Sequence, residues 1–188
     1  MIYLENARKD MFPGMVRFYD DYPVKGIRFV DITPLFMSKL SMEIVVNSVA
    51  DFFHNKVTMV AGIEARGFIL GTAIANQLGV GFVPLRKKGK LPGDVYTASF
   101  RKEYGEDVIE MKKDALAEET HVLIVDDVLA SGGTFKAAAR IMDWAKVKPS
   151  YYCFINLNLT PENYSLNGEL YVDYLIDMKG KKQKPEML

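Results

Sequence analysis

The sequence predicts an α/β domain whose core is a parallel sheet flanked by helices. Short apolar runs alternate along much of the chain with segments of helical periodicity, which is the pattern of βαβ units. One run, residues 122–125 (Val-Leu-Ile-Val), is continuously apolar, as is typical of a strand buried on both faces of a parallel sheet. The terminal segments do not alternate. We therefore expect one domain over residues 1–188, with a core at about 41–157 and a small hood formed by about 1–40 and the C-terminal segments.

Charge and cysteine content exclude several classes of protein. Lys and Arg together number 24, as do Asp and Glu, so the formal net charge is zero and no global field favours nucleic acid or an anionic membrane. The single cysteine, Cys153, excludes an internal disulfide and a Cys-based zinc cluster, and its apolar neighbours predict a buried thiol. No secretory signal or apolar run of membrane-spanning length is visible. We therefore expect a cytoplasmic protein with no nucleic-acid or membrane partner.

The first half of the chain predicts a short strand, a helix and then a βαβ unit. The short strand lies within residues 26–34 and ends in a turn. Ser41 is a plausible N-cap for a helix that runs to about His54. Further along, the expected elements follow the βαβ order: a strand at 57–61, a helix from Gly67 to about Leu78 and a strand at 80–85.

The second half predicts a hairpin and then the rest of the sheet. Residues 94–114 alternate loosely, so we expect an exposed antiparallel flap whose short strands are 98–100 and 107–111. The helix after the central strand has an apolar face made by residues at helical spacing: Phe135, Ala138, Ala139 and Met142. Two more strands are expected, at 151–157 and 171–176.

The strongest signal for a binding site follows the central strand. Asp126 and Asp127 stand where we expect that strand to end, and a turn of small residues, 130–134 (Ala-Ser-Gly-Gly-Thr), leads into the helix. Glycines, hydroxyls and the free N–H groups of a helix N-terminus suit a phosphate. The two acids would repel a phosphate and instead suit vicinal sugar hydroxyls, or a sugar together with Mg²⁺. This order indicates a ribose 5-phosphate, and the alternative is a βα turn whose acids only cap it or face solvent.

A second turn, residues 64–67 (Glu-Ala-Arg-Gly), also lies between a strand and a helix. Arg66 could bind a diphosphate with two parallel hydrogen bonds, and Gly67 would allow a close backbone approach. The alternative is a surface arginine, but a cation at a helix start opposes the helix dipole, which favours a bound anion.

A basic cluster follows the next predicted strand, and its members are Arg86, Lys87, Lys88 and Lys90. We expect a pyrophosphate, or acids from another subunit, to neutralise it.

On the flap, Glu103 could close over a site and exchange a proton with a substrate nitrogen, although the residues alone favour an exposed hairpin-turn glutamate.

Residues 121–134 resemble the signature of phosphoribosyltransferases, the enzymes that use 5-phosphoribosyl-1-pyrophosphate (PRPP). The resemblance implies that Asp126 and Asp127 contact the ribose hydroxyls. It also implies that the 5′-phosphate is held by the turn residues Ala130, Ser131, Gly132, Gly133 and Thr134. Further segments are similar, in order and spacing, to adenine phosphoribosyltransferases: 26–34, 63–68, 86–93, 102–105 and 113–116. The likeness covers about residues 20–145.

The resemblance implies a type I phosphoribosyltransferase fold and a purine-salvage reaction, adenine + PRPP giving AMP + pyrophosphate. Mg²⁺ would be the cofactor, held by Asp126 and Asp127 indirectly through ribose or water, and the protein would be a homodimer. The remaining implied roles are these: Arg66 and Lys87 on the diphosphate, Glu103 as the acid/base on the flap with Tyr104 beside it, and Phe29, with Arg28 next to it, at the base.

Two departures from the family pattern leave alternatives open. Val30 follows Phe29 where the family often has Arg. Asn158 stands where the family commonly has Glu, and a Leu-x-Gly-Arg run after it has no clear match. One alternative is therefore transfer to another purine, namely hypoxanthine, guanine or xanthine. The other is a non-catalytic PRPP-binding regulator.

Overall fold

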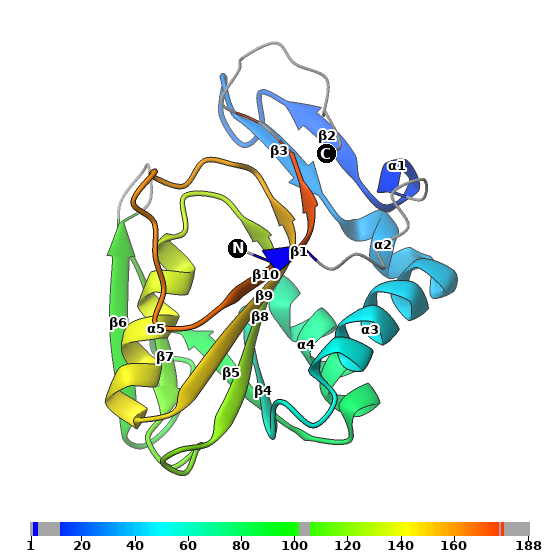
Figure 1. Cartoon of the computed structure of the whole chain (residues 1–188). Coiled ribbons are helices and arrows are strands. Elements are labelled where there is room, and N and C mark those ends of the chain that lie inside the picture. The colour runs from blue at the N-terminus through cyan, green and yellow to red at the C-terminus, as the bar shows by residue number, and fades with distance from the viewer. Residues whose placement is uncertain (1, 4–11, 102–105, 177, 179–188) are drawn as a thin grey trace.

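The computed structural model describes residues 2–3, 12–101, 106–176 and 178. Its centre is an eight-stranded sheet in the order β1-β10-β9-β8-β4-β5-β7-β6 (Figure 1). The strands are β1 (Ile2–Tyr3), β4 (Met59–Ile63), β5 (Gly81–Lys87), β6 (Val95–Arg101), β7 (Glu106–Lys112), β8 (His121–Leu129), β9 (Lys148–Asn156) and β10 (Leu170–Leu175). The helices are α1 (Phe12–Met15), α2 (Thr33–Met37), α3 (Lys39–Phe53), α4 (Arg66–Leu78) and α5 (Gly133–Ala145).

Strand directions confirm the predicted α/β class. The strands β1, β10, β9, β8, β4 and β5 pair in parallel, whereas β7 and β6 extend the sheet antiparallel beyond β5. Gly62 near the end of β4 pairs with Val125 of β8. The carboxyl ends of these two neighbouring strands therefore meet at one edge of the sheet, which is where ligands of parallel α/β sheets bind.

The central strand β8 is buried on both faces, as its apolar run predicts. Leu123 and Val125 pack in one core cluster, with apolar residues of α3 and α4. Val122 and Ile124 pack in a second cluster, with the predicted apolar face of α5. Figure 1 shows the corresponding layers, with α3 and α4 on one side of the sheet and α5 on the other. Cys153 is fully buried in the second cluster, and burial raises the pKa of its thiol.

The prediction that Ser41 caps the first long helix is wrong, because the helix begins one turn earlier. Ser38 is the N-cap of α3, and its hydroxyl oxygen accepts a hydrogen bond from the Ser41 N–H at 3.2 Å. Ser41 lies in the first turn and is buried. Both serines follow the same capping chemistry, so the residue type alone did not distinguish them.

Several strands run further than predicted, and two of them, β8 and β5, carry candidate site residues. β8 continues past Asp126 and Asp127 to Leu129, because its pairing with β9 continues through Asp126↔Cys153 and Val128↔Ile155. β5 likewise extends to Lys87, because Arg86 and Lys87 pair with β7. The acids and the first two basic residues are thus held on strands. β4 begins two residues later than expected, at Met59.

The hairpin β6–β7 is the predicted antiparallel flap, but the description of it as exposed is wrong. Its strands pair along their whole length, and β7 also pairs with β5. Several of its side chains are buried against α5 and the sheet, namely Ala98, Phe100, Ile109 and Met111. The tip, with Glu103 and Tyr104, lies outside the described residues.

A separate two-stranded sheet, β2 (Arg17–Asp20) and β3 (Arg28–Asp31), lies beyond the carboxyl end of the main sheet (Figure 1). Val30 and Val16 attach it to the core cluster on the α3 and α4 side. The division into hood and core stays a prediction, although β10, which follows residue 157, belongs to the main sheet.

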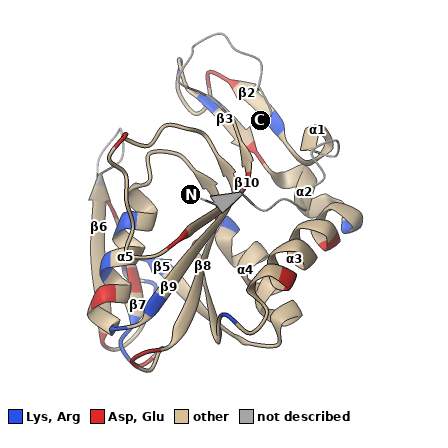
Figure 2. Ribbon diagram, in the orientation of Figure 1, with Lys and Arg blue, Asp and Glu red and all other residues tan. Residues whose placement is uncertain are grey.

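Charges of both signs are interspersed over the described elements (Figure 2). This distribution agrees with the zero formal net charge of the sequence. Among the described residues, none of the helices combines the length and apolar character needed to cross a bilayer.

Asp173, on β10, is a buried acid outside the predicted site. It is 6% exposed, and its Oδ2 accepts a hydrogen bond from the Tyr152 hydroxyl of β9 at 2.6 Å. Burial raises the pKa of Asp173 from 3.8 to about 7, although the hydrogen bond from Tyr152 acts to lower it. The folded chain therefore keeps a proton that the unfolded chain releases.

We expect the wild-type protein to lose stability relative to Asp173→Asn as the pH rises between these two pKa values. The stabilisation by the bound proton is complete below the unfolded pKa and disappears as the pH passes the folded pKa. The loss should total on the order of 4 kcal/mol. Chemical unfolding at several pH values checks this, with Asp114→Asn as an exposed control. Parallel curves for wild type and Asp173→Asn would contradict the assignment.

Candidate active site

Two βα turns lie side by side at the carboxyl edge of the sheet. One turn follows β4 and begins α4 at Arg66, and the other follows β8 and begins α5 at Gly133. Because β4 and β8 are neighbouring parallel strands, the N-termini of both helices face this edge. Helix N-termini carry unpaired N–H groups and a partial positive charge, so the edge suits a ligand with two anionic groups.

Arg66 and Asp127 join the two turns directly. The Nε of Arg66 lies 2.8 Å from Oδ2 of Asp127, which is 3% exposed. The anion that offsets the cation at the start of α4 is therefore a carboxylate of this chain itself. The Arg66 side chain remains 39% exposed, so its guanidinium is open to solvent as well as to Asp127.

The two adjacent acids are both harder to ionise than ordinary aspartates. Burial and the neighbouring charge of Asp127 raise the pKa of Asp126. Burial also raises the pKa of Asp127, and the guanidinium of Arg66 counteracts this rise. Hydroxyl donors or a cation facing the pair would stabilise its charged form. Vicinal sugar hydroxyls can supply such donors.

Gly67 allows α4 to approach β8 closely enough for this pair to form. A Cβ atom at position 67 would lie 2.6 Å from the Val125 carbonyl oxygen and 3.3 Å from Oδ1 of Asp126. No side chain fits in that space, so the packing of α4 on β8 depends on glycine here.

The small-residue turn after β8 takes the conformation expected of an anion-binding loop. Gly132 is the N-cap of α5 and has φ of +81°, a left-handed conformation that favours glycine. Ala130 and Ser131 are exposed, and Gly133 and Thr134 are partly exposed. The N–H groups of the first helical turn and the two hydroxyls are thus available to one ligand at this turn.

The basic cluster is neutralised partly within the chain, which corrects the expectation of a pyrophosphate or another subunit for all of it. Arg86 contacts both oxygens of Glu64, Nε to Oε2 and Nη2 to Oε1, each at 3.3 Å. The Lys87 N–H also donates to Glu64 Oε2 at 2.8 Å. The hydrogen bond from Arg86 is the main cause that lowers the pKa of Glu64. The side chains of Lys87, Lys88 and Lys90 are exposed.

Phe29 and Arg28 lie on opposite faces of β3. The guanidinium carbon of Arg66 lies 5.5 Å from the centroid of the Phe29 ring. Arg28 instead pairs with Asp20, Nε to Oδ1 at 3.2 Å, and lies over the ring of Phe18. The geometry therefore brings Phe29 to the site and gives no support to Arg28 as a base-binding residue.

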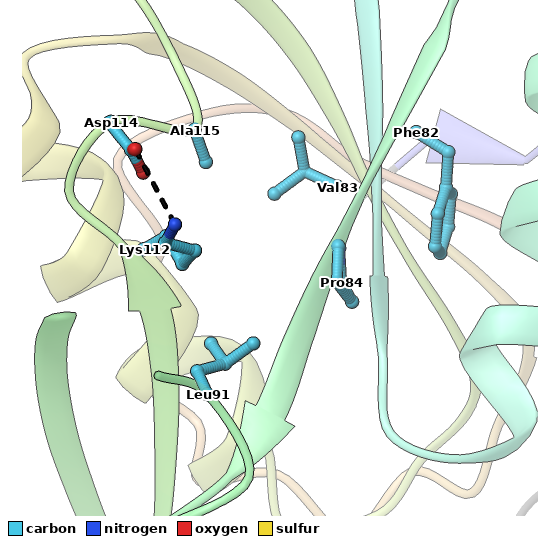
Figure 3. A pocket seen from close by; sticks show the side chains of 7 residues that line it. All are labelled: Phe82, Val83, Pro84, Leu91, Lys112, Asp114 and Ala115. Carbon is cyan, nitrogen blue, oxygen red and sulfur yellow. Dashed lines mark hydrogen bonds and ion pairs between the residues drawn. The ribbon is translucent and has the colours of Figure 1, made fainter. Parts of the chain in front are cut away.

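Glu103 and Tyr104, the predicted catalytic acid/base and its neighbour, lie outside the described residues. A shallow pocket elsewhere on the described surface contains none of the predicted site residues (Figure 3). Its lining comes from β5 and from segments near β7: Phe82, Val83, Pro84, Leu91, Lys112, Asp114 and Ala115.

The described residues contain no group of three or more His, Cys, Asp or Glu side chains that could hold a metal. Asp126 and Asp127 offer two neighbouring carboxyl groups, and a nearby cation would offset the burial that raises their pKa values. They could hold an Mg²⁺ ion indirectly, through ribose hydroxyls or water, since this ion usually keeps several of its waters.

Two residues of the site were missed from the sequence. Glu64 could have been found, because it directly follows β4 and Arg86 lies near the end of β5, and the two strands are neighbours. Tyr164 contacts Gly132 across 32 residues, with its hydroxyl 3.1 Å from the Gly132 carbonyl oxygen. No spacing in the sequence indicates that contact.

The phosphoribosyl transferase domain family matches residues 36–155 of this chain. The adenine phosphoribosyltransferase of Methylobacillus flagellatus is 48% identical over 131 residues, which cover 69% of this chain and 74% of that protein. The adenine phosphoribosyltransferase of Bacteroides fragilis is 41% identical over 162 residues, covering 86% and 88% respectively.

Solved structures are similar over most of the chain. The adenine phosphoribosyltransferase of Saccharomyces cerevisiae, complexed with an imino-altritol bisphosphate and adenine, has a TM-score of 0.79 and 32% identity, covering 84% of this chain and 93% of that one. The Giardia lamblia enzyme, complexed with 9-deazaadenine, has a TM-score of 0.76 and 33% identity, and the match covers 92% of this chain and 97% of that one.

Arg66→Ala should destabilise the free protein by about 1–3 kcal/mol at pH 8 and by less at pH 5. Without Arg66 the buried Asp127 carboxyl faces no cation, so its folded pKa rises further above the unfolded value. The variant therefore loses stability relative to wild type as the pH rises. Because the Arg66 guanidinium is partly exposed to solvent, we expect the loss of stability to lie toward the lower end of this range.

Chemical unfolding at the two pH values measures this difference. Arg140→Ala, on the exposed side of α5, controls for removal of a guanidinium. An equal loss at both pH values would show that the Arg66–Asp127 pair is not its source.

Proposed function

This chain belongs to the adenine phosphoribosyltransferases of the type I phosphoribosyltransferase family, and on that premise we propose that its site converts adenine and PRPP into AMP and pyrophosphate. The reaction is a step of purine salvage. One observation supports the roles proposed below. The Arg66 turn (residues 64–67), the acid pair (Asp126 and Asp127) and the phosphate turn (residues 130–134) lie together at one edge of the sheet. PRPP has two anionic ends separated by a ribose, which is the order of these three groups.

PRPP would bind with its 5′-phosphate on residues 130–134 and its ribose hydroxyls on Asp126 and Asp127. Its diphosphate would lie toward Arg66 and the exposed Lys87 at the end of β5. Arg66 would then exchange part of its contact with Asp127 for the diphosphate, and the hydroxyls would replace it at the acid. The ion pair of the free protein thus holds both partners near their working positions.

Adenine would stack on Phe29, the ring of β3 that lies closest to Arg66. The guanidinium carbon of Arg66 is 5.5 Å from that ring centroid, so a stacked base lies beside the diphosphate end of PRPP. This arrangement would bring N9 of the base toward C1′ of the ribose. Holding the two reacting atoms close together removes much of the entropic cost of the reaction.

In the chemical step a bond forms between adenine N9 and C1′ while the bond from C1′ to the pyrophosphate oxygen breaks. The ribose gains oxocarbenium character, and the departing electron pair stays on pyrophosphate. Arg66 and Lys87 would stabilise that charge, and Glu103 would accept the proton that N9 loses. Mg²⁺, held indirectly by Asp126 and Asp127, would neutralise charge on the diphosphate.

We also infer a homodimer in the cytoplasm. The inference follows the family resemblance, and the three exposed lysines of the basic cluster, Lys87, Lys88 and Lys90, are consistent with a dimer. A neighbouring subunit, a pyrophosphate or both could neutralise them.

The base preference is tested by incubating the protein with PRPP, Mg²⁺ and one purine at a time, and by following nucleotide and pyrophosphate. We expect AMP to form in clear preference to the nucleotides of hypoxanthine, guanine and xanthine. Preference for a 6-oxopurine would overturn the adenine assignment while keeping the PRPP site. PRPP binding with no turnover on any purine would instead indicate a regulator.

Glu103→Ala should lower kcat by on the order of 10²–10⁴-fold with little change in the affinity for PRPP. The reason is that an acid/base group takes part in proton transfer in the transition state and does not contact the bound diphosphate. Single-turnover kinetics and PRPP titration measure the two quantities separately. Glu106→Ala, at the start of β7, is the matched acid on the same hairpin. Unchanged turnover in Glu103→Ala would end the assignment.

A further inference from the structure

The segment between β9 and β10, residues 157–169, contains Asn158, one of the two departures from the family pattern, and the roles proposed above leave it unused. It is held against α5 at two points (Figure 1). The Asn167 side-chain amide donates to the Ala139 carbonyl at 3.1 Å and to Asp143 Oδ1 at 2.6 Å. The second point is Tyr164, whose hydroxyl contacts Gly132 in the phosphate turn, residues 130–134, at the N-terminus of α5.

The Tyr164 ring occupies the space beside Gly132. A Cβ atom at position 132 would lie 2.2 Å from Cε2 and 2.6 Å from Cζ of this ring. The ring is partly buried, packs against the core cluster on the α5 side, and lies 5.3 Å from the ammonium of Lys136. Its contact with the turn is therefore close, and a side chain at position 132 would push the two apart.

The Tyr164 hydroxyl fixes one peptide group of the turn. It donates to the Gly132 carbonyl at 3.1 Å, and the Lys136 N–H donates to the same oxygen at 3.0 Å. Because a peptide group is planar and trans, a fixed Gly132 carbonyl directs the Gly133 N–H the opposite way. That N–H belongs to the first helical position, where it has no partner within the helix.

We propose that Tyr164 is a positioning residue for the 5′-phosphate, acting through the Gly132–Gly133 peptide group. It holds the Gly133 N–H in the direction that an anion at the turn requires. The proposal rests on the function proposed above, since it assumes that the turn receives the phosphate of PRPP. It gives the divergent segment a part in substrate binding that the sequence did not indicate.

Ligand binding by Tyr164 variants distinguishes a purely structural role of this residue from a positioning role. If the ring only fills space, then Tyr164→Phe keeps its contribution, and any loss of folding would weaken all ligands alike. If the hydroxyl orients the turn, then Tyr164→Phe weakens only ligands that carry the 5′-phosphate. Ribose 5-phosphate and pyrophosphate separate the two cases, because pyrophosphate is expected on the Arg66 side.

We expect Tyr164→Phe to weaken the binding of ribose 5-phosphate about threefold, measured by calorimetry, and to leave that of pyrophosphate with Mg²⁺ unchanged. The factor is modest because the Lys136 N–H still holds the Gly132 carbonyl. In steady-state assays the KM for PRPP should rise by the same factor with kcat unchanged, as for lost uniform binding. Tyr164→Ala should weaken ribose 5-phosphate tenfold or more, roughly.

Tyr171→Phe is the matched control, because it removes a tyrosine hydroxyl that donates to Glu169 in the same region without contacting the turn. Wild-type affinity for ribose 5-phosphate in Tyr164→Phe would overturn the proposal, as would equal weakening of both ligands. Calorimetric binding does not depend on turnover. If the wild-type protein binds ribose 5-phosphate but turns over no purine, that result therefore contradicts the proposed function and leaves the Tyr164 proposal testable by binding.

Discussion

The site depends on how closely α4 approaches β8. Gly67 leaves room for the Val125 carbonyl and the Asp126 carboxyl, and this proximity places Arg66, the preceding residue, beside Asp127. Parallel pairing of β4 and β8 sets the two turns side by side, and the missing side chain at Gly67 brings them within ion-pair distance. The turn proposed to bind an anion and the two acids proposed to bind the sugar thus become parts of one site without any long loop.

Charge is partly balanced within this edge of the sheet before any substrate arrives. Asp127 faces Arg66, and Glu64 faces Arg86 while also accepting the Lys87 N–H. These pairs hold the cations on strand and helix ends, which are rigid, and leave the guanidinium of Arg66 partly open to solvent. A diphosphate would then meet cations that are already in position, so little reorganisation is needed on binding.

Much of this could be predicted from the sequence, because the strongest signals were local. The apolar run at 122–125 predicted a strand buried on both faces, and the glycines and hydroxyls at 130–134 predicted the turn that starts α5. The length of β8 and the burial of the β6–β7 hairpin were not predictable in this way, because pairing with β9 and packing on α5 decided them. Arg28 shows the same limit, since alternation on β3 placed its side chain away from Phe29. Contacts such as Tyr164 with Gly132 join distant segments and leave no trace in spacing.

The separate β2–β3 sheet has a consequence for how such a protein can diverge. Phe29, the candidate base-stacking ring, belongs to this small sheet, whereas the acids and both anion-facing turns belong to the main sheet. Substitutions around Phe29 can therefore accumulate without moving the groups that would hold the sugar and its phosphates. Gly67 has no such freedom, because even one methyl group there would separate the two turns. A change in the β2–β3 sheet would therefore alter the proposed base contact first, whereas a change at Gly67 would disturb the sugar-phosphate half of the site.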